Sequence, residues 1–135
     1  MKLATALLLA STLDATTYYV TVAGLGGEPD YEQRFSGWAT ELDKILKAGG
    51  DAVVETLHGP ASTRAAVRGS LERIAKAAQK NDAVVLLLIG HGSFDGADYK
   101  INLPGPDLTA IEMATLLDRI PASRQLVVNT TSASG

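Results

Sequence analysis

Residues 83–89 form an unbroken apolar run, Ala-Val-Val-Leu-Leu-Leu-Ile, with Asn81 and Asp82 before it and Gly90 after it. A strand with one face in solvent alternates apolar and polar side chains, whereas a strand covered on both faces is apolar throughout. The run is much shorter than the roughly 18 apolar residues that a membrane span requires. It therefore predicts a central strand of a mainly parallel sheet that has helices on both faces.

Strands and helices alternate along the rest of the chain. Residues 18–23, 52–57 and 125–129 are rich in β-branched side chains and predict three further strands. Amphipathic stretches between them predict three helices, the first ending at Gly49 and the others spanning residues 60–80 and 109–120. This order predicts right-handed crossovers and an α/β fold, a three-layer sandwich around one mainly parallel sheet.

The helical patterns also predict which side chains reach the core. The first helix carries apolar residues at spacings of three and four, namely Phe35, Trp38, Leu42 and Ile45. We expect this face to be buried with Trp38 as a core anchor, and Asp30 and Gln33 to form a capping box. The second helix has a comparable apolar stripe, Val67, Leu71, Ile74 and Ala78, and Thr109 with Glu112 forms a capping box for the third.

Composition narrows the possible functions. With 135 residues the chain is long enough for one domain, and its net charge of −3 provides no basic surplus for a dedicated nucleic-acid binder. There is no cysteine, which excludes disulfides, thiolate zinc sites and a cysteine nucleophile.

The amino terminus resembles an export signal. Lys2 precedes an apolar run over residues 3–10, and small residues lead up to Ala15. We therefore predict a signal peptide over residues 1–15, a domain over residues 16–135, and a periplasmic or extracellular location. The alternative is a cytoplasmic protein whose first strand or helix begins in this run.

Two polar clusters follow predicted strands. Gly90, His91, Gly92 and Ser93 come directly after the apolar strand, and residues 130–135 follow the last one. Ligands of open α/β sheets bind at the carboxyl ends of the strands, so the two clusters share a crevice if their strands are neighbours. A histidine between glycines is poorly explained by packing. The alternative is a histidine that only forms a hydrogen bond with a loop.

These residues carry a family resemblance that extends over about residues 17–135. The second helix, the apolar strand, Gly90-His91-Gly92 and the later Ser132-Ala-Ser-Gly resemble the caspase-like cysteine peptidases, nearest the legumain branch and its bacterial members. That family has His-Gly after one strand and Cys-x-Ser-Gly after the next. The resemblance implies a caspase- or flavodoxin-like sheet and a peptide or protein substrate, with peptides containing Asn or Asp as the first to test.

The resemblance also implies roles for particular residues. His91 is similar to the general acid/base, the Gly92 N–H to an oxyanion-hole donor, and Ser132 stands where the family has its nucleophilic cysteine. Arg34 lies near the position of a substrate-pocket arginine. Members of the family continue beyond this point with further strands and helices, so the sequence predicts an incomplete domain.

Serine at the nucleophile position changes the chemistry that is expected. A thiol ionises readily beside an imidazole, whereas a hydroxyl needs a general base in contact and usually a third group that orients the base. Asp95 and Asp98 are candidates for that third group, and Thr130 and Ser134 stand where a serine nucleophile elbow has glycines. Three interpretations follow: a natural pseudo-peptidase, which we favour, an active serine enzyme, or an engineered Cys→Ser variant.

Other functions remain as alternatives. One is a non-catalytic peptide-binding or scaffold module, and another is a tetrapyrrole metal chelatase, because some of those enzymes carry a similar His-Gly-Ser after a strand. His58, His91, Asp95 and Asp98 are the available metal ligands, a small set. The glycines at 24, 26 and 27 are followed by Pro29 where a dinucleotide fingerprint needs its third glycine. We therefore predict no cofactor and no metal. Residues 102–107 form either a pocket-shaping loop or a plain connector.

Overall fold

A computed structural model describes residues 14–133. It confirms the predicted α/β sandwich with a parallel sheet. Four strands form this sheet in the order β2-β1-β3-β7, and all three pairings are parallel: β1 (Thr17–Ala23), β2 (Val53–Leu57), β3 (Ala83–Ile89) and β7 (Arg124–Asn129). The predicted export signal lies almost wholly outside the described residues, so export stays a prediction. Ser134 and Gly135 also lie outside them.

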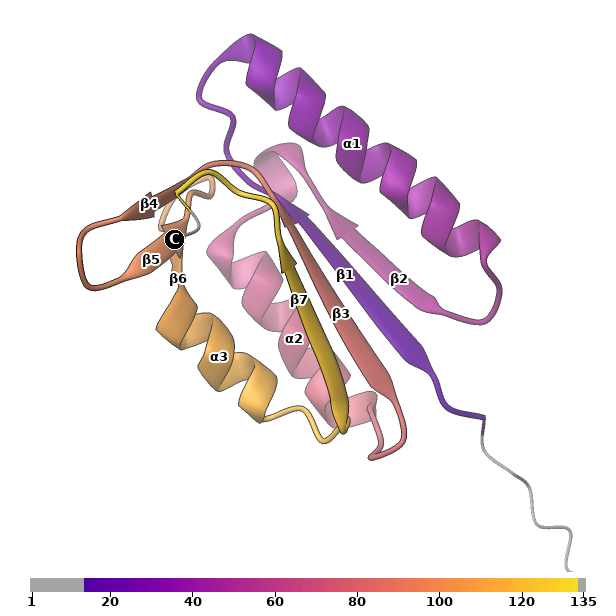
Figure 1. Ribbon diagram of the computed structural model, residues 1–135. Helices are drawn as coiled ribbons and strands as arrows, with labels where there is room; N and C mark the ends of the chain where they lie inside the picture. Colours follow the sequence, from indigo (N-terminus) through magenta and orange to yellow (C-terminus); the bar gives the residue numbers. More distant parts are fainter. Residues whose placement is uncertain (1–13, 134–135) are drawn as a thin grey trace, which may run out of the picture.

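Helices cover both faces of the sheet (Figure 1). Helix α1 (Pro29–Ala48) packs on β1 and β2, while α2 (Arg64–Ala77) and α3 (Ala110–Asp118) lie on the opposite face. A single 3₁₀ turn (Gly59–Ala61) precedes α2. No helix within residues 14–133 is long and apolar enough to cross a membrane.

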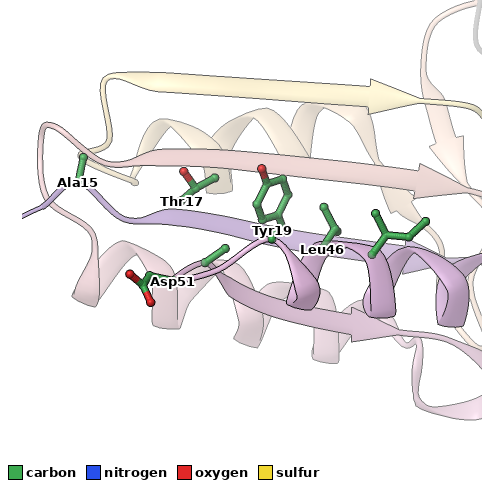
Figure 2. A pocket seen from close by; sticks show the side chains of 8 residues that line it. Ala15, Thr17, Tyr19, Leu46 and Asp51 are labelled. Carbon is green, nitrogen blue, oxygen red and sulfur yellow. The ribbon is translucent and has the colours of Figure 1, made fainter.

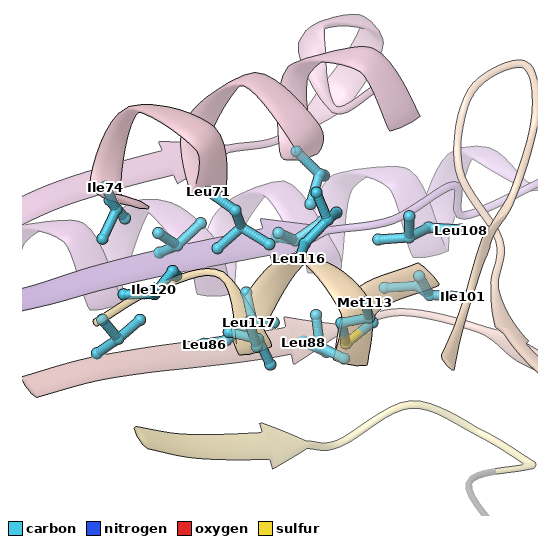
Figure 3. Packing of buried hydrophobic residues seen from close by; sticks show 14 of the residues in the cluster. Leu71, Ile74, Leu86, Leu88, Ile101, Leu108, Met113, Leu116, Leu117 and Ile120 are labelled. Atoms are coloured by element: carbon cyan, nitrogen blue, oxygen red, sulfur yellow. The ribbon is translucent and has the colours of Figure 1, made fainter. Parts of the chain in front are cut away.

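The main core lies between the sheet and the α2–α3 layer (Figure 3). The predicted stripe is buried at all four positions: Val67, Leu71 and Ile74 of α2, and Ala78, the residue that follows the helix. Leu71 is fully buried, as are Leu86 of β3 and Leu108. Burying a leucine side chain contributes about 1.5–3 kcal/mol, so this cluster supplies much of the stability of the domain.

Helix α1 buries only part of the apolar face that the sequence predicts: Phe35 is buried and Leu42 packs against the same cluster. Phe35 and Ala39 point into a small cluster with Ala23 and Ile89, whereas Trp38 is 54% exposed and Ile45 is 65% exposed. The prediction of Trp38 as a core anchor is therefore wrong. Ile45 instead borders an open hollow over Thr17 and Tyr19 of β1, so this side of the helix is not packed into the small cluster.

The start of α1 also differs from the prediction. Pro29 is the first helical residue and Glu28 precedes it without a side-chain cap, so Asp30 and Gln33 do not form a capping box. Instead the carboxylate of Glu32 turns back and accepts hydrogen bonds from the backbone N–H groups of Gly26 (2.7 Å) and Gly27 (3.2 Å). The carboxylate thereby fixes the loop after β1.

A second, antiparallel sheet between β3 and α3 was not predicted. It has the order β4-β5-β6 and consists of β4 (Gly92–Phe94), β5 (Tyr99–Ile101) and β6 (Leu108–Thr109). Strands of two or three residues are too short to show a periodic pattern, which explains the miss. The predicted capping box of α3 is confirmed in part: the Thr109 hydroxyl accepts from Glu112 N–H at 3.1 Å, whereas the Glu112 carboxylate pairs with Arg64 and Arg68.

Asp82 ties the start of β1 to the loop before β3, and this contact predicts a pH dependence of stability. Its carboxylate accepts from Gln79 N–H (2.7 Å) and from Thr16 N–H (2.8 Å), and these two donors hold the pKa of Asp82 below its usual range. Because the pKa of Asp82 is lower in the folded than in the unfolded protein, where it is about 3.9, its ionised carboxylate stabilises the fold at pH values above about 3.9. This stabilisation is lost as the pH falls through the pKa of the folded state.

We therefore expect Asp82→Asn to lower the free energy of unfolding most at neutral pH. The difference from the wild type should shrink as the pH falls below about 4, because the wild-type carboxyl is then protonated as well. Urea denaturation at a series of pH values measures this. A difference that stays constant from neutral to acidic pH would contradict the assignment.

Candidate active site

The candidate site lies at the carboxyl ends of the neighbouring strands β1 and β3, where the chain continues to opposite faces of the sheet. After β1 the chain enters α1 on one face, and after β3 it enters β4–β6 and α3 on the other (Figure 1). In open α/β sheets such a point is the usual ligand crevice. The two loops lie very close together: Gly24 N–H donates to Ile89 C=O at 2.8 Å, and a Cβ added to Gly90 would lie 3.2 Å from Gly24 N.

His91 and Ser132 face each other at this edge, as the sequence predicts. Strands β3 and β7 are hydrogen-bonded neighbours paired through Leu88 and Asn129, so the segments that follow them run side by side. The Nδ1 atom of His91 lies 3.4 Å from the Oγ atom of Ser132. The backbone N–H of Gly92 donates to the same Oγ atom at 3.3 Å. All three predicted catalytic residues therefore meet around one hydroxyl.

Backbone contacts position Ser132 over the end of β3. The N–H and the hydroxyl of Thr130 both donate to Leu88 C=O, at 3.0 and 2.7 Å, and Ser132 N–H donates to Gly90 C=O at 3.3 Å. The next residue, Ala133, has a positive φ of 53°, which is uncommon for a residue with a side chain. The turn presents the Ser132 side chain at the surface, beside His91.

A polar cluster behind Ser132 connects β7 to the small sheet. The Thr131 hydroxyl donates to Asn129 Oδ1 at 2.7 Å, and the Tyr99 hydroxyl of β5 forms a hydrogen bond with Thr131 Oγ1. Gly92 lies against this cluster, and a Cβ at that position would be 2.5 Å from Tyr99 Cε2 and 2.6 Å from Ser132 O. Position 92 therefore has no room for a side chain.

Aromatic packing, rather than a carboxylate, orients His91. The imidazole makes edge contacts with Tyr31 (ring centroids 4.7 Å apart) and Phe35 (5.1 Å), both from the first turns of α1. The sequence suggested Asp95 or Asp98 as a third group. Asp95 instead accepts from Ala97 and Asp98 N–H groups in the β4–β5 turn, and these donors lower its pKa. Within residues 14–133 no carboxylate is hydrogen-bonded to His91.

Arg34 is less closely tied to the site than the sequence suggests. Its side chain is exposed on α1, and no ion pair or hydrogen bond of Arg34 is found among the described residues. The same part of α1 contributes Tyr31 and Phe35 instead. Phe35 was predicted only as a core residue, because the sequence does not reveal that this face of the helix also contacts the histidine.

A pocket of about 340 Å³ opens beside His91. It is lined by the loop after β1, by His91 and by the segment after β5: Leu25, Gly26, Gly27, His91, Asn102, Leu103, Gly105 and Asp107. This favours the pocket-shaping interpretation of residues 102–107.

Another hollow of about 340 Å³ lies at the opposite end of the sheet, between β1 and the end of α1, where Thr17, Tyr19 and Asp51 line it (Figure 2). That hollow carries no histidine.

The side chains that the metal alternative would need do not converge among the described residues. No three side chains among the His, Asp and Glu residues of the described range lie close enough to share a metal ion. His58 is exposed at the end of β2, and Asp95 belongs to the β4–β5 turn. The described residues therefore give the chelatase alternative no ligand set.

Comparison with known proteins supports the fold. The chain matches no protein-family model and no curated protein. Among solved structures it is similar to protein GSU0716 from Geobacter sulfurreducens, with 23% sequence identity and a TM-score of 0.62. The match covers 85% of this chain and 49% of that one, so the chain spans about half the length of this neighbour. At this level of identity the likeness supports the α/β fold alone.

Proposed function

We propose that this protein carries a caspase-like, legumain-like peptidase site that binds a peptide but hydrolyses it slowly or not at all, a pseudo-peptidase. In this proposal His91 takes the acid/base position, Gly92 N–H the oxyanion-donor position and Ser132 the nucleophile position. The observation that carries it is the meeting of His91 Nδ1 and Gly92 N–H at Ser132 Oγ, at 3.4 and 3.3 Å. A nucleophile, a base and a fixed donor within reach of one carbonyl are what acyl transfer requires.

The reaction that such a site supports is attack of Ser132 Oγ on a peptide carbonyl carbon. The hydroxyl proton would pass to His91 Nδ1, and from there to the departing amine as the C–N bond breaks; water would then release the acyl group. Gly92 N–H, which donates to Oγ in the free protein, would donate to the carbonyl oxygen as negative charge develops there.

Two features argue that the serine form is slow. The separation of 3.4 Å exceeds the 2.6–3.2 Å or so at which a base abstracts a proton efficiently, although such contacts are often looser without substrate. In addition, His91 is held by Tyr31 and Phe35, and aromatic edges do not stabilise an imidazolium as a carboxylate does. These features favour peptide binding over rapid turnover.

A thiol titration tests the proposed pairing directly. In a Ser132→Cys variant the thiol should ionise below its usual pKa of about 8.5, because the imidazole of His91 can take its proton. The rate of alkylation by iodoacetamide, followed by mass spectrometry across pH, reports that pKa. Adding His91→Ala should move the midpoint back up.

Ser123→Cys serves as the matched control for this titration. Ser123 is an exposed serine at the start of β7, at the other end of the sheet, so its thiol should titrate normally with or without His91. If both engineered thiols titrate alike, His91 does not act on position 132 and the proposed dyad is wrong.

A further inference from the structure

We propose that the pocket beside His91 binds a positively charged side chain, lysine or arginine, of the bound peptide, and that Asp107 selects it. The inference rests on the proposed function, since it names the substrate class of the same site. It departs from the Asn- or Asp-containing peptides implied by the family resemblance. Its basis is the balance of hydrogen-bond donors and acceptors that line the pocket.

The acceptors of the pocket are concentrated on one wall. Asp107 lines the pocket, and its carboxylate is fixed by two donors: Oδ1 accepts from Leu103 N–H (3.0 Å) and Oδ2 from the Asn102 side-chain amide (3.1 Å). A carboxylate has about four lone-pair sites, so both oxygens can accept further bonds from a ligand. The two contacts hold the charge in place without neutralising it.

The Asn102 side chain adds a second acceptor. Its amide nitrogen donates both to Asp107 Oδ2 and to Ser93 Oγ (3.3 Å), so both of its hydrogens are engaged. The amide oxygen then remains as the group that can receive a ligand's donor. A carboxylate and an amide oxygen side by side suit an ammonium or guanidinium group, both of which only donate.

The donors of the pocket are largely used within the protein. Leu25 N–H donates to Asn102 C=O at 2.8 Å, and Gly26 and Gly27 N–H both donate to the Glu32 carboxylate. Asn102 N–H donates to His91 C=O at 3.0 Å. A carboxylate or a carboxamide oxygen from a substrate would therefore meet few free N–H groups in this loop pair.

Charge points in the same direction. The residues that line the pocket include no lysine and no arginine, and the Glu32 carboxylate is hydrogen-bonded to the backbone of two of them, Gly26 and Gly27. Arg34 follows Glu32 on α1 but is exposed and does not line the pocket. An acidic side chain of a peptide would be repelled here, whereas a basic one would be attracted.

The test is a binding measurement that does not depend on turnover. Two fluorescein-labelled peptides, identical except for arginine or its neutral analogue citrulline at one position, are titrated with the wild-type protein by fluorescence polarisation. We expect the arginine peptide to bind at least about tenfold more tightly, and the ratio to fall towards one in Asp107→Asn. Asp118→Asn, an equal charge change at the exposed end of α3, should leave the ratio unchanged.

A second measurement distinguishes loss of the ion pair from a general disturbance of the loop. Because Asp107→Asn could disturb the loop, the wild-type ratio is also measured against salt, where an ion pair predicts that the advantage of arginine declines. Equal or tighter binding of citrulline, or a ratio insensitive to both Asp107→Asn and salt, would overturn the inference. The thiol titration described above decides the proposed function independently, since it uses no peptide.

Discussion

Replacing Ser132 by cysteine is expected to raise peptide hydrolysis at least about 100-fold above the wild-type chain. The gain should arise because a thiol 3.4 Å from an imidazole becomes a thiolate, while the serine hydroxyl in the same place keeps its proton. A panel of fluorogenic peptides that includes Arg, Lys, Asn and Asp at the cleaved position measures it.

The controls for this gain separate chemistry from a general thiol effect. Ser123→Cys adds an exposed thiol far from the site and should give no hydrolysis. His91→Ala in the Ser132→Cys background should remove most of the gain, since general acid–base catalysis contributes about 10²–10⁴-fold. A folded Ser132→Cys protein with no hydrolysis of any peptide would count against a usable active site and leave the peptide-binding module as the better description.

Gly92→Ala is expected to lower the hydrolysis of the Ser132→Cys protein by about 100-fold, because displacements near 1 Å at a reacting centre have effects of this size. A methyl group at position 92 would lie 2.5 Å from Tyr99 Cε2 and 2.6 Å from Ser132 O, so the turn that carries the nucleophile must move. The backbone N–H survives the change, so the loss would report geometry rather than a missing donor.

Gly37→Ala provides the matched control in the opposite direction. Gly37 lies within α1, and a Cβ there would meet no atom within 4 Å. Alanine in an exposed helix is favoured over glycine by about 0.5–1 kcal/mol, so this variant should be more stable and equally active. Chemical denaturation measures the first quantity and the peptide assay the second. Equal activity in the Gly92→Ala and Gly37→Ala proteins would mean that the crowding at position 92 does not matter.

The strong periodic signals in the sequence predict the fold well. The apolar run at residues 83–89 coincides with β3, and the stripe of α2 is buried as expected, because burial on both faces or along one stripe leaves a direct mark on residue choice. Trp38 and Ile45 could not be placed, since the spacing of apolar residues along a helix does not show which part of its apolar face is buried against the sheet. The strands β4 to β6 were missed because pairing of so few residues leaves no periodicity.

Part of the candidate site could also be predicted from the sequence, and part could not. His91 and Ser132 could be brought together from the sequence, because carboxyl ends of adjacent parallel strands share one edge. Tyr31, Tyr99 and Asp107 could not, since their place depends on how α1 and the small sheet fold over that edge. Arg34 was chosen by position in the chain, and a helical position alone does not determine which side chain of a turn faces the crevice.

The chain leaves β1 and β3 toward opposite faces of the sheet, and this separates the hydrophobic core from the loops that would contact a ligand. Residues 24–27 and 102–107 form the walls beside His91, yet the main hydrophobic layer is assembled chiefly by α2, α3, β1 and β3. Changes of sequence or length in those two walls should alter ligand preference at little cost in stability, except at Leu103, whose side chain is buried, and at Gly24 and Gly26, where a Cβ would collide with the backbone of Asn102 and of Glu32. Such an arrangement lends itself to exchange of whole loops between related domains as a way to obtain new recognition.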